Sequence, residues 1–148
     1  MAAQKSYSLE QLFRALADST RLRLLNLMNG REVCVCYFVE ILKTSQPKIS
    51  RHLAYLRRAG IVAARRDGKW MHYRLVPPPS HAGGEILEQA LHAVGKDKRF
   101  KADRERLKLA CCRPQSFVSL QGAPQPLHLR TQNNSMNLIL GASLPKGR

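Results

Sequence analysis

Four cysteines carry the most specific chemistry in this chain, and they form two close pairs. One valine separates Cys34 from Cys36, and Cys111 is adjacent to Cys112. Thiolates are soft ligands that select soft or thiophilic ions. No ring nitrogen or carboxylate stands directly beside Cys34 or Cys36 in the sequence. The first pair therefore favours a sulfur-only site over a mixed zinc site.

The spacing of the first pair restricts the backbone that can carry it. Residues i and i+2 of a regular helix lie about 200° apart around the helix axis and cannot face one ion. Cys34 and Cys36 therefore converge only where the backbone is not helical. Because a short helix is predicted over 36–43, we expect ion binding to unwind or displace the start of that helix.

The charge balance indicates a polyanionic partner. Lys and Arg number 25 against 10 Asp and Glu, a formal net charge of +15. A field of this sign favours nucleic acid first and an anionic membrane second. The N-terminal residues lack the apolar core of a signal peptide, and no apolar run approaches the roughly 18 residues that span a bilayer. We therefore expect a cytoplasmic protein without a membrane partner, whose thiols stay reduced.

Hydrophobic periodicity predicts a mainly α-helical domain with one small β-hairpin. Strands over 61–66 and 70–76 flank Asp67-Gly68-Lys69, a glycine-containing hairpin turn. Capping residues mark several helix starts, among them Ser8, Asp18 or Ser19, and Ser45. The predicted helices cover residues 8–18, 21–29, 36–43, the segment from 45 up to Gly60, 81–94 and 98–111.

The composition changes after residue 112. The segment 113–148 contains four prolines, no acidic residue and no clear amphipathic period. A segment of this kind buries too little apolar surface to offset the entropy of ordering it. We predict that residues 1–112 form a single folded domain, which carries most of the basic charge, and that 113–148 form a mostly disordered tail.

Two short helices that meet at a tight turn before a basic hairpin are typical of a winged helix-turn-helix. In that arrangement the second helix reads the major groove and the hairpin flanks it near the DNA backbone. Glutamine pairs with adenine and arginine with guanine, whereas lysine, serine and histidine contact phosphate more often. The candidate DNA-binding residues are Gln46, Lys48, Ser50, Arg51 and His52 on the helix and Arg65, Arg66 and Lys69 on the hairpin.

Three segments resemble the ArsR/SmtB family of metalloregulatory repressors: Val33-Cys34-Val35-Cys36, SQPKISRHLAYLRRAGIV at 45–62 and RRDGKWMHYRL at 65–75. The resemblance covers about residues 8–94, and the Cys-Val-Cys motif is similar to that of the arsenical-resistance branch. It implies a homodimer, paired through the first helix and the helix after the hairpin, on double-stranded operator DNA with an inverted repeat. It also implies a repressor, not an enzyme, that leaves the DNA when trivalent arsenic or antimony binds Cys34 and Cys36, derepressing arsenical-resistance genes.

One position departs from that branch. Arsenical repressors of this kind often carry a third cysteine three residues after the second, and this chain has Val39 there. The third ligand then comes from Cys111 or Cys112 of the same or the partner chain, from an external thiol, or from hydroxide. Alternatively, Cys111 and Cys112 form a second site, or they are only two small residues at a helix end.

Other functions fit parts of the sequence. Zinc-sensing members of the family use a site on the helix after the hairpin; His81 and His92 match its histidine spacing, but Pro79 and Gly95 occupy its acidic positions. A sensor of zinc, cadmium or lead on the same scaffold is therefore the main alternative. A thiol redox enzyme such as a small arsenate reductase is disfavoured, because there is no Cys-x-x-Cys motif or phosphate-binding loop. An architectural DNA binder that senses no ion would leave the cysteines unexplained.

Overall fold

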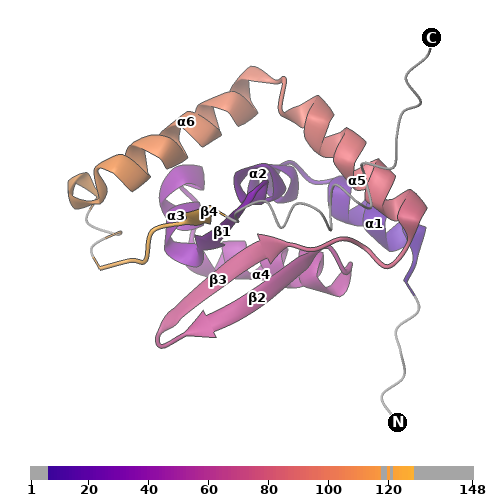
Figure 1. Cartoon of the computed structure of the whole chain (residues 1–148), viewed down its shortest axis with the longest axis horizontal. Helices are drawn as coiled ribbons and strands as arrows, with labels where there is room; N and C mark the ends of the chain where they lie inside the picture. Colours follow the sequence, from indigo (N-terminus) through magenta and orange to yellow (C-terminus); the bar gives the residue numbers. More distant parts are fainter. Residues whose placement is uncertain (1–6, 118–119, 121, 129–148) are drawn as a thin grey trace.

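A computed structural model describes residues 7–117, 120 and 122–128. In Figure 1, α5 and α6 form an arch over α2 and α3, and α4 lies below them with the hairpin β2–β3. No helix in the described ranges has the length and apolar character needed to cross a membrane. The helices are α1 (Leu9–Leu16), α2 (Ser19–Met28), α3 (Val35–Leu42), α4 (Gln46–Arg58), α5 (His81–Val94), α6 (Lys98–Cys112) and the 3₁₀ turn η1 (Pro114–Ser116); the strands are β1 (Arg31–Cys34), β2 (Val62–Asp67), β3 (Trp70–Leu75) and β4 (Leu127–His128).

The sheet is antiparallel, in the order β2-β3-β1-β4. The predicted hairpin is confirmed: Asp67 pairs with Trp70, and Gly68 takes φ 57° in the turn, a conformation that glycine adopts without strain. Strand β1 is not among the predicted elements. It has four residues, and its partner β3 lies about 40 residues further along the chain, with Cys34 opposite His72. A strand so short is defined by this distant pairing and not by local periodicity.

The helix starts follow the predicted caps in part. Asp18 caps α2, because its Oδ1 accepts a hydrogen bond from the backbone N–H of Arg21 at 2.9 Å. Ser8 and Ser45 occupy the N-cap positions of α1 and α4, but their side chains make no capping hydrogen bond. Helix α4 ends just before Gly60, where φ is +78°. The helix pair α3–α4, followed by the hairpin, is a winged helix-turn-helix.

The core collects one apolar face from every helix, with Leu12, Leu24, Phe38, Leu53 and Leu107 fully or almost fully buried. Helix α6 is attached to this core by polar contacts as well. The Arg23 guanidinium forms two hydrogen bonds with Asp103, at 2.6 and 2.7 Å, and the Asp103 carboxylate raises the pKa of Arg23. Since Asp103 is 1% exposed, its charge depends on this partner.

We expect Arg23→Ala to lower the free energy of unfolding by about 3 kcal/mol, because it leaves a buried carboxylate without its partner. Urea denaturation would measure the loss. Arg106 is the matched control, because its side chain is 60% exposed and approaches Asp103 only to 3.9 Å. Arg106→Ala should change stability by less than about 0.5 kcal/mol. Equal unfolding midpoints for the two variants would contradict the prediction.

The chain continues to pack beyond residue 112. Leu120 is buried in the core, and β4 pairs with β1 through Arg31↔His128 and Glu32↔Leu127. This part of 113–148 therefore differs from the disordered tail that composition predicts, because pairing with β1 and one buried leucine order it. Residues 118–119, 121 and 129–148 lie outside the described residues, and the division at residue 112 stays a prediction.

Candidate thiol site and nucleic-acid interface

The first cysteine pair lies where β1 runs directly into α3. Cys34 ends the strand and takes the N-cap position of α3 in an extended conformation, with φ −70° and ψ 143°. Cys36 is the second residue of the helix, and 2.9 Å separates the two sulfur atoms. The two thiols therefore converge without unwinding of α3, and displacement of α3 by a bound ion stays a prediction. The change from strand to helix at residue 35 already turns both thiols toward each other.

The contact between the sulfurs changes the acidity of both thiols. A hydrogen bond from the Cys36 S–H lowers the pKa of Cys34 to about 7, against the opposing effect of burial. The same hydrogen bond, together with burial, raises the pKa of Cys36. The pair therefore holds one proton between two sulfurs near neutral pH. Above about pH 7 the Cys34 sulfur is therefore mainly a thiolate, the form that binds ions.

We expect ultraviolet thiolate absorbance to show one step with a midpoint near pH 7. A lowered pKa means that the fold favours the thiolate, so this contribution to stability is lost as the pH falls through 7. In Cys36→Ala the midpoint should move up toward the ordinary thiol value, because the S–H donor is gone. Cys112→Ser, which changes an exposed cysteine, serves as the control and should keep the step. A wild-type protein without a step near neutrality would contradict the prediction.

The second cysteine pair ends α6, and its two members have different surroundings. Cys112 is exposed, whereas Cys111 is half-buried and its backbone oxygen accepts a hydrogen bond from Gln125. Burial raises the pKa of the Cys111 thiol. Cys111 lies within electrostatic range of Tyr37, the residue that follows Cys36, and α6 packs against α3. Nevertheless, no three His, Cys, Asp or Glu side chains form a group that could hold a metal ion in the described part of the chain.

A ring nitrogen does lie near the first pair in space. His72 on β3 is the cross-strand neighbour of Cys34, so both side chains emerge on the same face of the sheet. The ring is 2% exposed, and neither of its nitrogens has a hydrogen-bond partner. The sequence alone does not identify His72 as a neighbour of Cys34, because only the register of β1 against β3 brings the two residues together.

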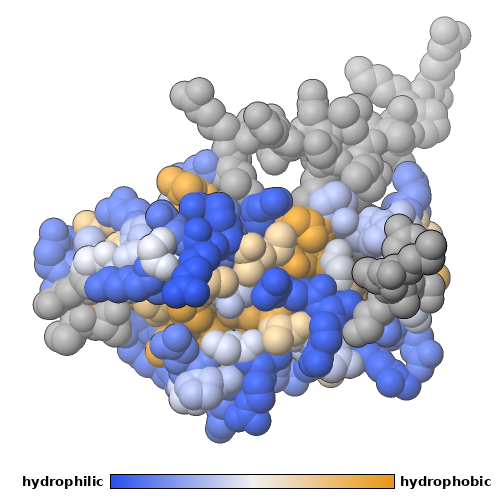
Figure 2. Space-filling view, turned by 90° about the horizontal axis from the view of Figure 1, so that it is seen from below, coloured by the Kyte–Doolittle hydropathy of each residue, from blue (hydrophilic) through white to orange (hydrophobic). Residues whose placement is uncertain are grey.

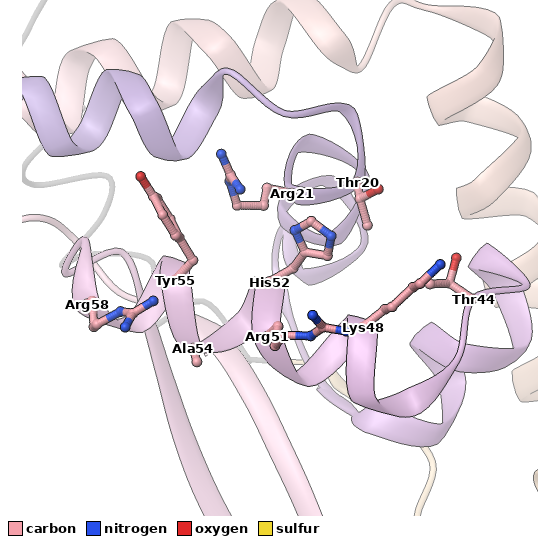
Figure 3. Close-up of a pocket in the computed structure, with 9 residues that line it drawn as sticks. All are labelled: Thr20, Arg21, Thr44, Lys48, Arg51, His52, Ala54, Tyr55 and Arg58. Atoms are coloured by element: carbon pink, nitrogen blue, oxygen red, sulfur yellow. The ribbon is translucent and has the colours of Figure 1, made fainter.

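Helix α4 presents a basic groove on the molecular surface. The groove has a volume of about 830 Å³, and Figure 3 shows basic and aromatic side chains of α4 facing residues of α2 across it. Three of its lining residues, Lys48, Arg51 and His52, are among the DNA-binding residues that the sequence predicts. His52 Nδ1 lies 3.7 Å from the Asp18 carboxylate. The spacing of Lys48, Arg51, Tyr55 and Arg58 along one helix face could have identified the last two. The lining residues not named from the sequence are Thr20, Arg21, Thr44, Ala54, Tyr55 and Arg58.

Aromatic stacking organises this groove. The Arg21 guanidinium lies 4.2 Å above the centre of the Tyr55 ring, and that of Arg58 lies 5.7 Å from it. Arg21 also donates to the carbonyl oxygens of Arg14 and Ala15 at the end of α1. The groove is therefore cationic and firmly attached to the rest of the domain. Seen from below, the molecule shows hydrophilic side chains around a central hydrophobic area (Figure 2).

The remaining predicted DNA-binding residues differ in exposure and in the contacts that their side chains make within the protein. Gln46 is exposed at the start of α4, and Ser50 is half-buried. Arg65 is held by the buried Glu32, with a nitrogen–oxygen distance of 2.6 Å, so its guanidinium fixes the hairpin onto β1. Arg66 and Lys69 are exposed at the hairpin turn, where Arg66 Nε donates to the Gly68 carbonyl oxygen at 3.0 Å and Lys69 lies over the Trp70 ring.

The two histidines with zinc-sensor spacing both lie on α5. His81 is exposed and lies 3.8 Å from Glu85, one turn further along the helix. His92 is also exposed. Eleven residues of helix separate them by about 16 Å along the axis, so the two rings of one chain cannot bind one ion.

Comparison with known proteins identifies the family to which this architecture belongs. Residues 18–64, from the cap of α2 into β2, match the family model described as bacterial regulatory protein, arsR family. The arsenical resistance operon repressor of Escherichia coli is 48% identical over 81 residues, which are 54% of this chain and 69% of that protein. The arsenic resistance transcriptional regulator ArsR1 of Pseudomonas putida is 42% identical over 109 residues, which are 73% of this chain and 84% of that regulator. The chain belongs to the ArsR family.

Members of the ArsR family are DNA-binding transcription regulators and not enzymes, so the basic groove on α4 has the character that the family requires. Among solved structures, reduced HlyU from Vibrio cholerae is 31% identical with a TM-score of 0.51, and the match covers 60% of this chain and 88% of that one. The likeness agrees with the winged helix-turn-helix seen here.

Proposed function

We propose that this ArsR-family protein is a transcriptional repressor that leaves its operator when trivalent arsenic or antimony binds Cys34 and Cys36. One observation carries the proposal: two thiols, one with a pKa lowered to about 7, lie 2.9 Å apart at the start of the helix that supports α4. Trivalent arsenic and antimony are thiophilic and exchange hydroxide for thiolate. The names of the Escherichia coli and Pseudomonas putida relatives support the same ligand class.

The repressor acts as a homodimer on double-stranded DNA. Leu9 and Phe13 lie four residues apart on α1 and are 41% and 56% exposed, an apolar face beside α5 that a second copy would cover. A two-fold axis there presents two copies of α4 to successive major grooves, which requires an inverted repeat in the operator. Gln46, Ser50 and Arg51 face the bases and neighbouring phosphates, and Lys48, His52, Arg66 and Lys69 face the backbone.

Two contacts couple the ion site to the DNA-binding elements. Cys36 belongs to α3, which packs against α4, and Cys34 belongs to β1, which pairs with β3 of the hairpin. An ion that binds both sulfurs imposes its own sulfur–sulfur separation and so changes the angle between these two DNA-binding parts. Binding of ion and operator is then mutually weakening by the same factor. Cys111 remains the candidate for a third sulfur, with Cys112 less suited because it is exposed.

A second candidate function is a sensor of divalent zinc, cadmium or lead. The observation that favours it is His72, a buried imidazole opposite Cys34 that makes no hydrogen bond and whose Nε2 lies 4.0 Å from the Asp67 carboxylate. Two sulfurs and one ring nitrogen are a donor set that zinc accepts readily. Arsenic and antimony have the stronger preference for sulfur alone.

Operator binding, followed by fluorescence anisotropy under reducing conditions, separates the two functions. Arsenite, antimonite and zinc are titrated against the full chain on its operator. Release by arsenite or antimonite at stoichiometric concentration is expected, with arsenite affinity lower in the presence of operator than in its absence. Release by zinc alone would favour the second function. Equal arsenite affinity with and without operator would refute the proposed coupling.

A further inference from the structure

The Tyr37 hydroxyl is a buried polar group without a partner beside the thiol pair. Tyr37 is 0% exposed, and its Oη makes no hydrogen bond in the described structure. It follows Cys36 directly in the first turn of α3, and its hydroxyl lies within electrostatic range of the Cys34, Cys36 and Cys111 thiols. Burial raises the pKa of Tyr37 to about 12, and the thiols of Cys111, Cys36 and Cys34 add to this effect.

A hydroxyl in this position costs stability unless something pairs with it. Leaving a buried donor without an acceptor forfeits the hydrogen bonds that water would supply. Tyr7 and His72 are the other side chains with buried, unpartnered polar atoms in the described ranges. Tyr7 lies against Gly83 of α5, away from the cysteines. Tyr37 is therefore the unsatisfied hydroxyl that lies at the candidate ligand site.

The chemistry of the ligand supplies a matching group. Arsenous acid carries three hydroxyl groups, and each thiol that binds displaces one of them. The Cys36 sulfur forms an arsenic–sulfur bond and its proton joins the departing hydroxide as water, whereas the hydroxide displaced by the Cys34 thiolate takes its proton from solvent; arsenic does not change its oxidation state. Cys34 and Cys36 account for two waters and leave one hydroxyl on arsenic. The described residues provide no group of three ligand side chains that would displace it.

We propose that the bound arsenic keeps its third hydroxyl and that the Tyr37 Oη hydrogen-bonds this hydroxyl inside the core. The inference rests on the proposed function and chooses hydroxide over Cys111 as the third ligand. Tyr37 then acts as a specificity-determining residue. It favours trivalent ions that keep an oxygen after binding two thiols over ions that lack one.

The test compares Tyr37→Phe with Tyr7→Phe, because each removes one buried, unpartnered hydroxyl and nothing else. Arsenite binding to the full chain without DNA is followed by the ultraviolet absorbance of the arsenic–sulfur bonds. We expect Tyr37→Phe to bind arsenite about five- to tenfold more weakly, the effect of one lost hydrogen bond, and Tyr7→Phe to bind as wild type. The unliganded Tyr37→Phe protein should unfold at the same temperature as wild type or above it.

X-ray absorption of the arsenic complex gives a direct readout of the ligand atoms. Two sulfur neighbours and one oxygen are expected, and Cys111→Ser should leave both the count and the affinity unchanged. Three sulfur neighbours, or equal arsenite affinity in Tyr37→Phe and wild type, would overturn the inference while leaving the role of Cys34 and Cys36 intact. A wild-type protein that fails to bind arsenite overturns both.

Discussion

Cys34→Ser is expected to abolish the release of operator DNA by arsenite while leaving DNA affinity within about twofold of wild type. The substitution removes the sulfur with the lowered pKa and breaks the pair that chelates the ion. Loss of a direct ligand should weaken arsenite binding by more than about 100-fold, since changes in outer-shell partners alone cost 10- to 100-fold. Anisotropy of labelled operator, titrated with arsenite under reducing conditions, measures both quantities.

The matched control is Cys112→Ser, which makes the same chemical change at an exposed cysteine. It should respond to arsenite as wild type does. Cys36→Ser should behave like Cys34→Ser, because either single sulfur leaves the ion without a chelating partner. Normal arsenite release in Cys34→Ser would exclude the β1–α3 junction as the sensor. Loss of DNA binding in Cys34→Ser would instead show that the serine damages the fold, and Cys34→Ala would then repeat the test.

Operator affinity is expected to fall by about 10³–10⁵ between 50 and 200 mM salt if the dimer neutralises six to ten phosphates. Lys48 and Arg51 lie in the groove on α4 and supply part of this charge. In the double variant Lys48→Ala/Arg51→Ala, the dimer loses four positive charges from its DNA surface. We expect binding at least about 100-fold weaker and a salt slope reduced by up to about 4. Anisotropy at a series of salt concentrations gives both values.

Lys101→Ala is the control for this second prediction. Lys101 is an exposed cation of α6, and α2 and α3 lie between α6 and α4 in Figure 1. Its removal should leave the salt slope unchanged. If Lys101→Ala and Lys48→Ala/Arg51→Ala reduced the slope equally, the affinity would come from overall charge and not from the groove on α4.

Local sequence signals predict the helices of this fold well. The period of apolar residues places α5 at 81–94, as observed, and α6 within one residue of its end. Asp18 is one of the two residues expected to cap α2, and it does so. These features depend on neighbours a few residues apart along the chain. Sequence reasoning can therefore find them without knowing the tertiary structure.

Features that depend on distant pairing could not be predicted in the same way. Strand β1 exists because β3 and β4 pair with its two edges, and its four residues carry no period of their own. The motif identified Cys34 and Cys36 as a pair, but their convergence follows from β1 ending where α3 begins. The sequence predicts that Arg65 contacts DNA, but in the structure its guanidinium is hydrogen-bonded to the buried Glu32, which lies 33 residues earlier in the chain. His72 lies opposite Cys34 because of the register of β3 against β1, which is also a long-range pairing.

The junction of β1 and α3 would make the proposed thiol site transferable to other proteins. The facing thiols owe their geometry to two backbone conformations, extended at Cys34 and helical at Cys36, and not to side chains collected from distant elements. A three-residue cassette, cysteine–any residue–cysteine, carries the whole chelating pair. Any winged domain in which the first strand runs without a loop into the supporting helix offers the same two Cβ directions. On the proposed function, ion response would therefore be gained by two substitutions, or lost by one, that touch no residue of the groove on α4.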